Sequence, residues 1–215
     1  GAEAHAASSA GGIGLAPQQV PVNFLDNHDL PRFLFDASPE QLRIALAYLF
    51  TWDGIPCVYY GTEQAFAGGV DPANREDLWG GNRALGYPAF DTTNPAFAQV
   101  RDLIAVRKQH EALRRGDVAV KWATRDPGAR RDAGIFGFER ASGSDKVLVV
   151  LNASTQDSET CAPIADGGAC MQTTFPAGTV LRDLAPGGDG MTFTVAAGGT
   201  VAVRVGPQRA RILAP

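Results

Sequence analysis

Residues 20–29 read VPVNFLDNHD, an apolar run that ends in four polar residues. The first six residues are typical of a short buried strand, because a strand of a parallel sheet is covered on both faces and carries few polar side chains. A second run of this kind, IPCVYY at residues 55–60, precedes a long Gly-rich loop over residues 61–88. We therefore expect two buried strands whose carboxyl ends are followed by polar loops.

Two helix patterns accompany these strands. Ser38-Pro39-Glu40 supplies a capping hydroxyl, a proline for the first helical position and an acid in the first turn, and an apolar stripe continues to about Thr51. A second helix is predicted from Asn94-Pro95 to near Gly116. The order strand, helix, strand, loop, helix is typical of parallel α/β units. Two such units cannot close a (β/α)8 TIM barrel, so the remaining strands are expected upstream of Gly1.

After residue 116 the pattern changes to short β-type runs separated by Gly, Asp, Pro and Ser. No helix-length pattern interrupts them, which predicts an antiparallel β-sandwich over residues 117–206. Residues 207–215 are predicted to be a tail. The expected fold class is thus α/β plus all-β: the last part of a (β/α)8 barrel over residues 1–116, followed by a β-sandwich domain.

Composition limits the possible functions. The chain has 215 residues, of which 45% are hydrophobic and 20% charged, so it can bury a core. Its net charge of −4 argues against a nucleic-acid partner, because phosphates require a basic face. No apolar run approaches the roughly 20 residues that cross a bilayer. Gly1 is not an initiator methionine, and we expect the chain to be incomplete at its N-terminus.

The three cysteines differ in their surroundings. Cys161 and Cys170 flank a loop rich in Pro, Asp and Gly, where a disulfide would stabilise the fold by about 2–3 kcal/mol and indicate a secreted or periplasmic location. The alternative is two unpaired loop thiols. Cys57 lies in an apolar run and is expected to be an inert buried thiol. No Cys-x₂-Cys pattern is present, so no zinc site is predicted.

Four segments resemble the α-amylase family of glycoside hydrolases. Residues 24–29 (FLDNHD) are similar to the segment after the seventh barrel strand, and residues 54–64 (GIPCVYYGTEQ) resemble the eighth-strand segment. Residues 68–75 (GGVDPANR) are similar to the following loop of fungal-type α-amylases and cyclodextrin glucanotransferases, and residues 192–200 (TFTVAAGGT) to the end of their β-sandwich domain. The resemblance covers residues 20–205 and identifies the chain as a C-terminal portion of such an enzyme. It implies that the two expected strands are strands 7 and 8 of the barrel, present with their helices, and that the sandwich is the C domain.

The resemblance assigns roles to two adjacent residues. Retaining glycosidases need a nucleophilic carboxylate and an acid/base carboxyl. The resemblance implies that the catalytic residue Asp29 is neither of these. Asp29 would bind sugar hydroxyls, support ring distortion and help keep the acid/base protonated, since one carboxylate raises the pKa of another nearby. His28 would donate a hydrogen bond to the same sugar. The alternative for Asp29 is a turn or capping aspartate ahead of Leu30-Pro31.

Asp71 and Arg75 form a second candidate pair. Their spacing of four residues allows an ion pair. The resemblance implies that both hydrogen-bond a glucose further along the donor side, around subsite −3, whereas the alternative is that they only brace the loop. Asn27 is interpreted as a positioning residue, with a sugar ligand as the alternative, and the resemblance implies that Glu63 is a supporting residue at the barrel rim. Asp26 either holds the loop or faces solvent and is not assigned. Trp79 and Tyr87 are interpreted as sugar-stacking or core residues.

The nucleophile and acid/base of this family belong to strands four and five, which this chain lacks, so the chain alone is expected to be inactive. The intact protein is expected to cleave α-1,4-glucans such as starch and maltodextrins. The alternatives are a cyclodextrin glucanotransferase-like transglycosylase and a non-catalytic carbohydrate-binding fragment. No further β-domain is expected after Val205, which favours hydrolysis. This chain suggests no cofactor and no metal ligands, although calcium is expected to be possible in the intact enzyme.

Overall fold

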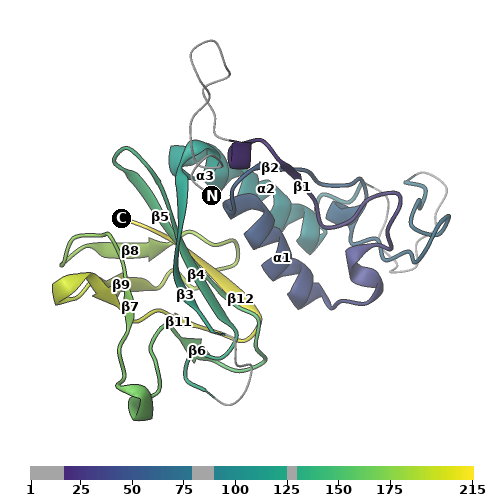
Figure 1. The fold of residues 1–215 in the computed structure, drawn as a ribbon. Coiled ribbons are helices and arrows are strands. Elements are labelled where there is room, and N and C mark those ends of the chain that lie inside the picture. Colours follow the sequence, from purple (N-terminus) through teal and green to yellow (C-terminus); the bar gives the residue numbers. More distant parts are fainter. Residues whose placement is uncertain (1–16, 79–89, 125–129) are drawn as a thin grey trace. The chain divides into compact units, whose positions relative to one another are not determined.

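The computed structural model describes residues 17–78, 90–124 and 130–215 (Figure 1). The chain divides into two compact units, Gly1–Ala105 and Val106–Pro215, which are described separately below. None of the described helices is long and apolar enough to cross a membrane.

The first unit is built on a parallel strand pair. β1 (Val22–Asn23) and β2 (Ile55–Pro56) lie side by side, with Val22 opposite Ile55. Backbone hydrogen bonds extend the pairing, since the N–H of Cys57 donates to the carbonyl of Asn23 at 2.8 Å. Both strands are shorter than the six-residue runs predicted. Within the described residues each strand has a partner on one side only, so Val22 and Ile55 are 55% and 49% exposed.

A capped helix connects the two strands. α1 (Pro39–Thr51) has the boundaries that the sequence predicts, and Ser38 and Gln41 form a reciprocal capping box at its start. Leu42, Leu46 and Leu49 on one face are buried. Gly54 then turns the chain into β2 with a φ of +93°, and a Cβ there would lie 2.7 Å from the carbonyl oxygen of Pro21.

The prediction of one helix from residue 94 to near residue 116 is wrong. α2 (Pro95–Gln109) ends before His110, and a short helix, α3 (Glu111–Arg115), follows. The break has a local cause, because Asp145 accepts hydrogen bonds from the backbone N–H of Ala112 at 2.8 Å and contacts Nδ1 of His110 at 2.9 Å. Short 3-10 helices complete the described elements: η2 (Pro17–Gln19), η3 (Phe33–Phe35), η4 (Thr62–Gln64), η5 (Ile164–Asp166) and η6 (Ala197–Gly199).

The second unit contains an antiparallel β-sandwich. Among the described residues its larger sheet has six strands in the order β3-β4-β5-β12-β8-β9, and two short pairs, β6 with β11 and β7 with β10, face it (Figure 1). The core between them is aliphatic and aromatic, with Leu148, Val150 and Leu181 fully buried. The strand bounds are β3 (Asp117–Ala123), β4 (Ile135–Ser142), β5 (Asp145–Asn152), β6 (Ser158–Glu159), β7 (Met171–Gln172), β8 (Val180–Asp183), β9 (Thr192–Thr194), β10 (Thr200–Val201), β11 (Arg204–Val205) and β12 (Arg209–Ala214).

The prediction of a tail over residues 207–215 is wrong. β12 lies inside the larger sheet and pairs with β5 on one side and β8 on the other. Ile212 and Leu213 are fully buried. The sequence pattern missed this strand because Arg209 and Arg211 interrupt its apolar run, and tertiary contacts compensate the buried charge of Arg211.

The cysteines behave differently from one another. Cys161 and Cys170 form a disulfide, which confirms the predicted bridge. The prediction of a buried Cys57 is wrong, because this thiol is exposed in the described chain. Cys57 directly follows β2, which has a strand partner on one side only.

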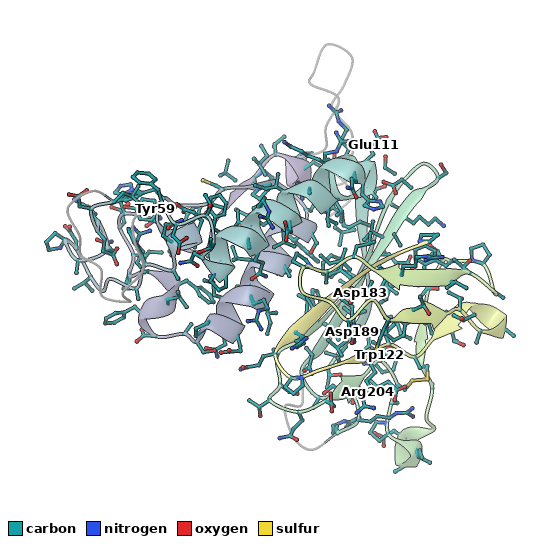
Figure 2. The ribbon with its side chains drawn as sticks, turned by 180° about the vertical axis from the view of Figure 1, so that it is seen from behind. Tyr59, Glu111, Trp122, Asp183, Asp189 and Arg204 are labelled. Carbon is teal, nitrogen blue, oxygen red and sulfur yellow. A yellow bond between two sulfur atoms is a disulfide. The ribbon has the colours of Figure 1, made fainter. Side chains whose placement is uncertain are left out.

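An ion-pair cluster ties β12 to β8 and to the loop before β9. The guanidinium of Arg211 contacts Oδ2 of Asp183 at 2.7 Å and binds Asp189 through both terminal nitrogens, one of them 2.9 Å from Oδ2. Figure 2 labels the two aspartates. The hydrogen bonds from Arg211 lower the pKa of Asp189 to about 2. The charge of Asp189 therefore stabilises the fold wherever this carboxyl is ionised.

We predict an acid-dependent effect of Asp189→Asn. The folded pKa of Asp189 lies below its ordinary value of 3.8, so its contribution is present above pH 4 and is lost as the pH falls through about 2. The difference in unfolding free energy between wild type and Asp189→Asn should shrink between pH 5 and pH 2. In an Arg211→Met background the substitution should have no such pH-dependent effect. A difference that stays constant with pH would contradict this linkage.

The placement of β12 predicts a large cost for Leu213→Ala. A buried leucine replaced by alanine loses about 2–5 kcal/mol through lost transfer energy and a cavity, whereas the same change in a tail would be neutral. Urea unfolding of the full chain, followed by circular dichroism, measures the loss. Ile164→Ala is the matched control, because Ile164 is 85% exposed and its truncation should change stability by less than about 0.5 kcal/mol. Equal effects of the two substitutions would argue against a central β12.

Candidate functional site

The loop after β1 begins with a buried anchor. Asp26 is only 2% exposed. Its carboxylate accepts hydrogen bonds from Oγ1 of Thr62 at 2.8 Å and from the backbone N–H of Phe33 at 3.0 Å. Asp26, which the sequence left unassigned, therefore fixes the start of this loop to the turn after β2.

Asn27 folds the next part of the loop into a tight turn. Its Oδ1 accepts from the backbone N–H groups of Asp29 and Leu30 at 2.8 and 3.0 Å. This agrees with the predicted positioning role. The turn-forming role considered for Asp29 thus belongs to Asn27, and the carboxylate of Asp29 is left to face outward.

His28 and Asp29 present their side chains to solvent from this turn. Their side chains are 63% and 70% exposed, and Nε2 of His28 lies 3.2 Å from Oδ1 of Asp29. An adjacent imidazole and carboxylate offer a hydrogen-bond donor and two acceptor oxygens at one surface. Such an arrangement suits a neutral ligand that carries several hydroxyl groups.

Asp71 and Arg75 lie on the loop after β2 and form the expected ion pair. Nη1 of Arg75 is 3.3 Å from Oδ1 of Asp71, and the two side chains are 47% and 57% exposed. Nε of Arg75 also donates to the carbonyl oxygen of His28 at 3.3 Å. The structure therefore brings the four predicted site residues, His28, Asp29, Asp71 and Arg75, into one connected group.

Asn74 links the loop after β2 to the loop after β1, and the sequence did not identify it as a site residue. It is fully buried, and its Nδ2 donates to the carbonyl oxygens of His28 and Leu30, both at 2.8 Å. These carbonyls belong to the residues directly before and directly after Asp29. The only signal in the sequence was the position of Asn74 within the quoted segment of residues 68–75.

A buried ion pair holds the bases of the two loops together. Nε of Arg32 lies 2.9 Å from Oε2 of Glu76, and both side chains are almost completely buried. Arg32 also donates to the carbonyl of Tyr60, and its guanidinium carbon lies 4.1 Å from the ring centroid of Tyr59. Tyr59 is labelled in Figure 2. Burial raises the pKa of the Tyr59 hydroxyl, with a further contribution from its hydrogen bond with Tyr60. Neither Arg32 nor Glu76 was identified from the sequence.

The remaining candidates from the sequence are Glu63, Trp79 and Tyr87. The carboxylate of Glu63 accepts a hydrogen bond from the backbone N–H of Gly61, two residues earlier, at 2.9 Å. This contact is consistent with a supporting role. Trp79 and Tyr87 lie outside the described residues. No group of three or more His, Cys, Asp or Glu side chains in the described part of the chain is arranged to hold a metal ion.

The chain is similar to enzymes that act on α-glucans. It is 33% identical over 188 residues to a cyclomaltodextrin glucanotransferase of Geobacillus stearothermophilus, a match that covers 86% of this chain and 23% of the relative. It is 31% identical to an α-amylase of Niallia circulans, covering 84% of this chain and 30% of that protein. The chain thus spans about a quarter of the length of these curated relatives. No protein-family model matches it.

Solved structures give the same picture. A γ-cyclodextrin glucanotransferase from Bacillus clarkii matches with a TM-score of 0.70 and 28% identity, over 89% of this chain and 25% of that one. The structure of CldA, described as a cyclomaltodextrin glucanotransferase with a three-domain ABC distribution, matches with a TM-score of 0.71 and 25% identity, over 91% of this chain and 36% of that one. The fold of the described chain therefore occurs in enzymes of this type.

The buried ion pair predicts a large effect of Arg32→Met on stability. The substitution leaves the charge of Glu76 buried without its partner, which costs about 3–5 kcal/mol. Chemical unfolding of the full chain measures this loss, and a second change, Glu76→Gln, in the same protein should recover part of it.

Arg101→Ala provides the control for Arg32→Met. Arg101 pairs with Asp102 at 2.7 Å, but both side chains are exposed, so its removal should cost less than about 1 kcal/mol. A neutral Arg32→Met would show that the two loops are held together by other contacts.

Proposed function

The chain belongs to the α-amylase family, and on that premise we propose that the whole protein is a retaining glycoside hydrolase that acts on α-1,4-glucans such as starch and maltodextrins. One observation carries the proposal: the exposed His28–Asp29 pair lies on a turn built by Asn27 and is joined through Arg75 to Asp71. This group offers carboxylate, imidazole and guanidinium groups to sugar hydroxyls along one connected surface.

In this proposal Asp29 supports the transition state without forming a bond to the sugar. Its exposed carboxylate accepts hydrogen bonds from ring hydroxyls, and these bonds strengthen as positive charge develops in the oxocarbenium-like transition state. Its charge also favours the protonated form of a nearby acid/base carboxyl. His28, at 3.2 Å from Asp29, donates to the same sugar unit.

Asp71 and Arg75 bind a sugar unit further along the donor side of the glucan. Both side chains are about half exposed and already share a hydrogen-bonded geometry at 3.3 Å, so their polar atoms are oriented before the ligand arrives. A carboxylate and a guanidinium together satisfy both the donor and the acceptor of a sugar hydroxyl. Bracing of the loop is the simpler role, and the exposure of the pair favours sugar binding in addition.

The first unit forms the last part of a (β/α)8 barrel in this proposal. The parallel pairing of β1 and β2, with a helix between them, is consistent with two successive barrel strands. Val22, Phe24 and Ile55 are about half exposed, and neighbouring barrel strands would cover them. The nucleophile and the acid/base would lie on those strands, so we expect this chain alone to be inactive.

A transglycosylase is the second candidate function. It shares the glycosyl-enzyme intermediate but transfers the sugar to a hydroxyl group in place of water. Its support comes from the relatives, several of which are cyclomaltodextrin glucanotransferases. The expectation that hydrolysis is favoured over transfer loses its basis, because CldA is described as a cyclomaltodextrin glucanotransferase with a three-domain ABC distribution. Product analysis separates the two functions, since cyclic dextrins form only by transfer.

The proposal extends to the location of the whole protein and to calcium binding. The disulfide supports a secreted or periplasmic location, where disulfides persist. A calcium ion, if the whole protein binds one, would draw on residues outside the described chain. A non-catalytic carbohydrate-binding protein would bind glucans without releasing reducing ends, and an assay of reducing ends distinguishes it from the proposed hydrolase.

We predict that Asp29→Asn in the whole protein lowers kcat on soluble starch by at least about 10³-fold. The amide keeps the shape of the side chain but removes the charge that stabilises the transition state. Thermal stability should stay within about 1 °C, since Asp29 is exposed. Reducing-end release measures kcat, and circular dichroism measures the melting temperature.

Asp36→Asn is the matched control for Asp29→Asn. Asp36 is an exposed aspartate that follows η3 on the same segment, so its substitution should leave kcat unchanged. Near-normal turnover of Asp29→Asn would refute the role assigned to Asp29. Starch hydrolysis by the 215-residue chain alone would refute the absence of the nucleophile and acid/base from it.

A further inference from the structure

We infer that Asn74 is a positioning residue that holds the His28–Asp29 turn in its reactive geometry and couples it to the Asp71–Arg75 pair. This inference rests on the proposed function. The argument begins from the two carbonyl oxygens that Asn74 binds, those of His28 and Leu30, each 2.8 Å from its Nδ2. These two carbonyls bracket Asp29, so a single amide group fixes the backbone before and after the carboxylate-bearing residue.

The side chain of Asn74 is specialised for this donation. It is fully buried, and its Oδ1 has no hydrogen-bond partner within the described residues. Burying an acceptor without a partner is unfavourable, and the two hydrogen bonds that the amide donates offset this cost. The amide is therefore placed for its two donated hydrogen bonds.

The carbonyl of His28 is shared between two donors of one loop. Asn74 binds it from the buried side at 2.8 Å, and Nε of Arg75 binds it from the exposed side at 3.3 Å. Arg75 also contacts Asp71. A sugar that engages the Asp71–Arg75 pair thus acts on the same peptide group that sets the position of Asp29.

The turn needs a support from outside itself. Asn27, whose side chain holds the backbone of Asp29 and Leu30, belongs to the same turn and does not attach it to another loop. Asn74 connects the turn to a different loop and so fixes its position in space. A displacement of about 1 Å at a catalytic group can lower a rate by about 10²-fold.

The test compares Asn74→Ala with wild type in the whole protein, using soluble starch as substrate. We expect kcat to fall by about 10–100-fold while KM changes by less than about threefold, because the sugar-binding side chains remain and only the placement of Asp29 is lost. Asn74→Asp keeps the volume of the side chain but removes the donor group, and it should lower kcat at least as much as Asn74→Ala.

Asn94→Ala is the matched control. Asn94 is also buried, at 1% exposed, and makes two hydrogen bonds, to the carbonyl of Gln64 and from the N–H of Ala96, neither of which reaches the His28–Asp29 turn. It should lose stability but keep its kcat when measured well below its melting temperature.

Each other outcome has a defined meaning. An unchanged kcat in folded Asn74→Ala, or a loss of kcat that Asn94→Ala matches, would overturn the inference. Failure of Asn74→Ala to fold where Asn94→Ala folds would assign Asn74 a structural role and would also overturn it. If the wild-type protein itself releases no reducing ends from starch, the proposed function fails. A folded and fully active Asn74 variant would instead overturn only the positioning role of Asn74.

Discussion

The ion pair between Arg32 and Glu76 is the constraint on which the arrangement of the first unit depends. Both charges are almost completely buried, so each would be strongly unfavourable alone, and the two loops that carry them must stay together to keep the pair formed. The guanidinium also packs against Tyr59 and donates to the carbonyl of Tyr60. A segment after β1 and a segment after β2, 44 residues apart at these positions, are thereby fixed to each other.

The polar residues of the site form two groups, a buried tier and an exposed tier, with different roles. The buried tier, formed by Asp26, Arg32, Asn74 and Glu76 as its polar members, binds backbone groups and orients the loops. The exposed tier consists of His28, Asp29, Asp71 and Arg75, whose side chains are largely accessible to solvent. This separation has a physical reason, because a buried side chain has no surface to present to a sugar.

The second unit follows a different logic, in which backbone pairing and apolar burial dominate. The larger sheet depends on β12, which supplies the neighbour that both β5 and β8 require. Arg211 in this strand is tolerated because Asp183 and Asp189 neutralise it at the sheet surface. A charged residue in a central strand thus marks a specific tertiary partner and does not exclude the strand.

The sequence by itself determined the features that rest on local chemistry: α1 with its capping box, the alternation of strand and helix, the β-rich second half and the chemically distinctive residues from Asn27 to Asp29. It could not determine β12 or the break at His110, because both result from partners distant in the chain, Asp183 for Arg211 and Asp145 for His110. Only the tertiary structure decided that Asn74 and Glu76 belong to the site. A buried polar residue is recognised by the atoms that satisfy it, and those atoms lie on another loop.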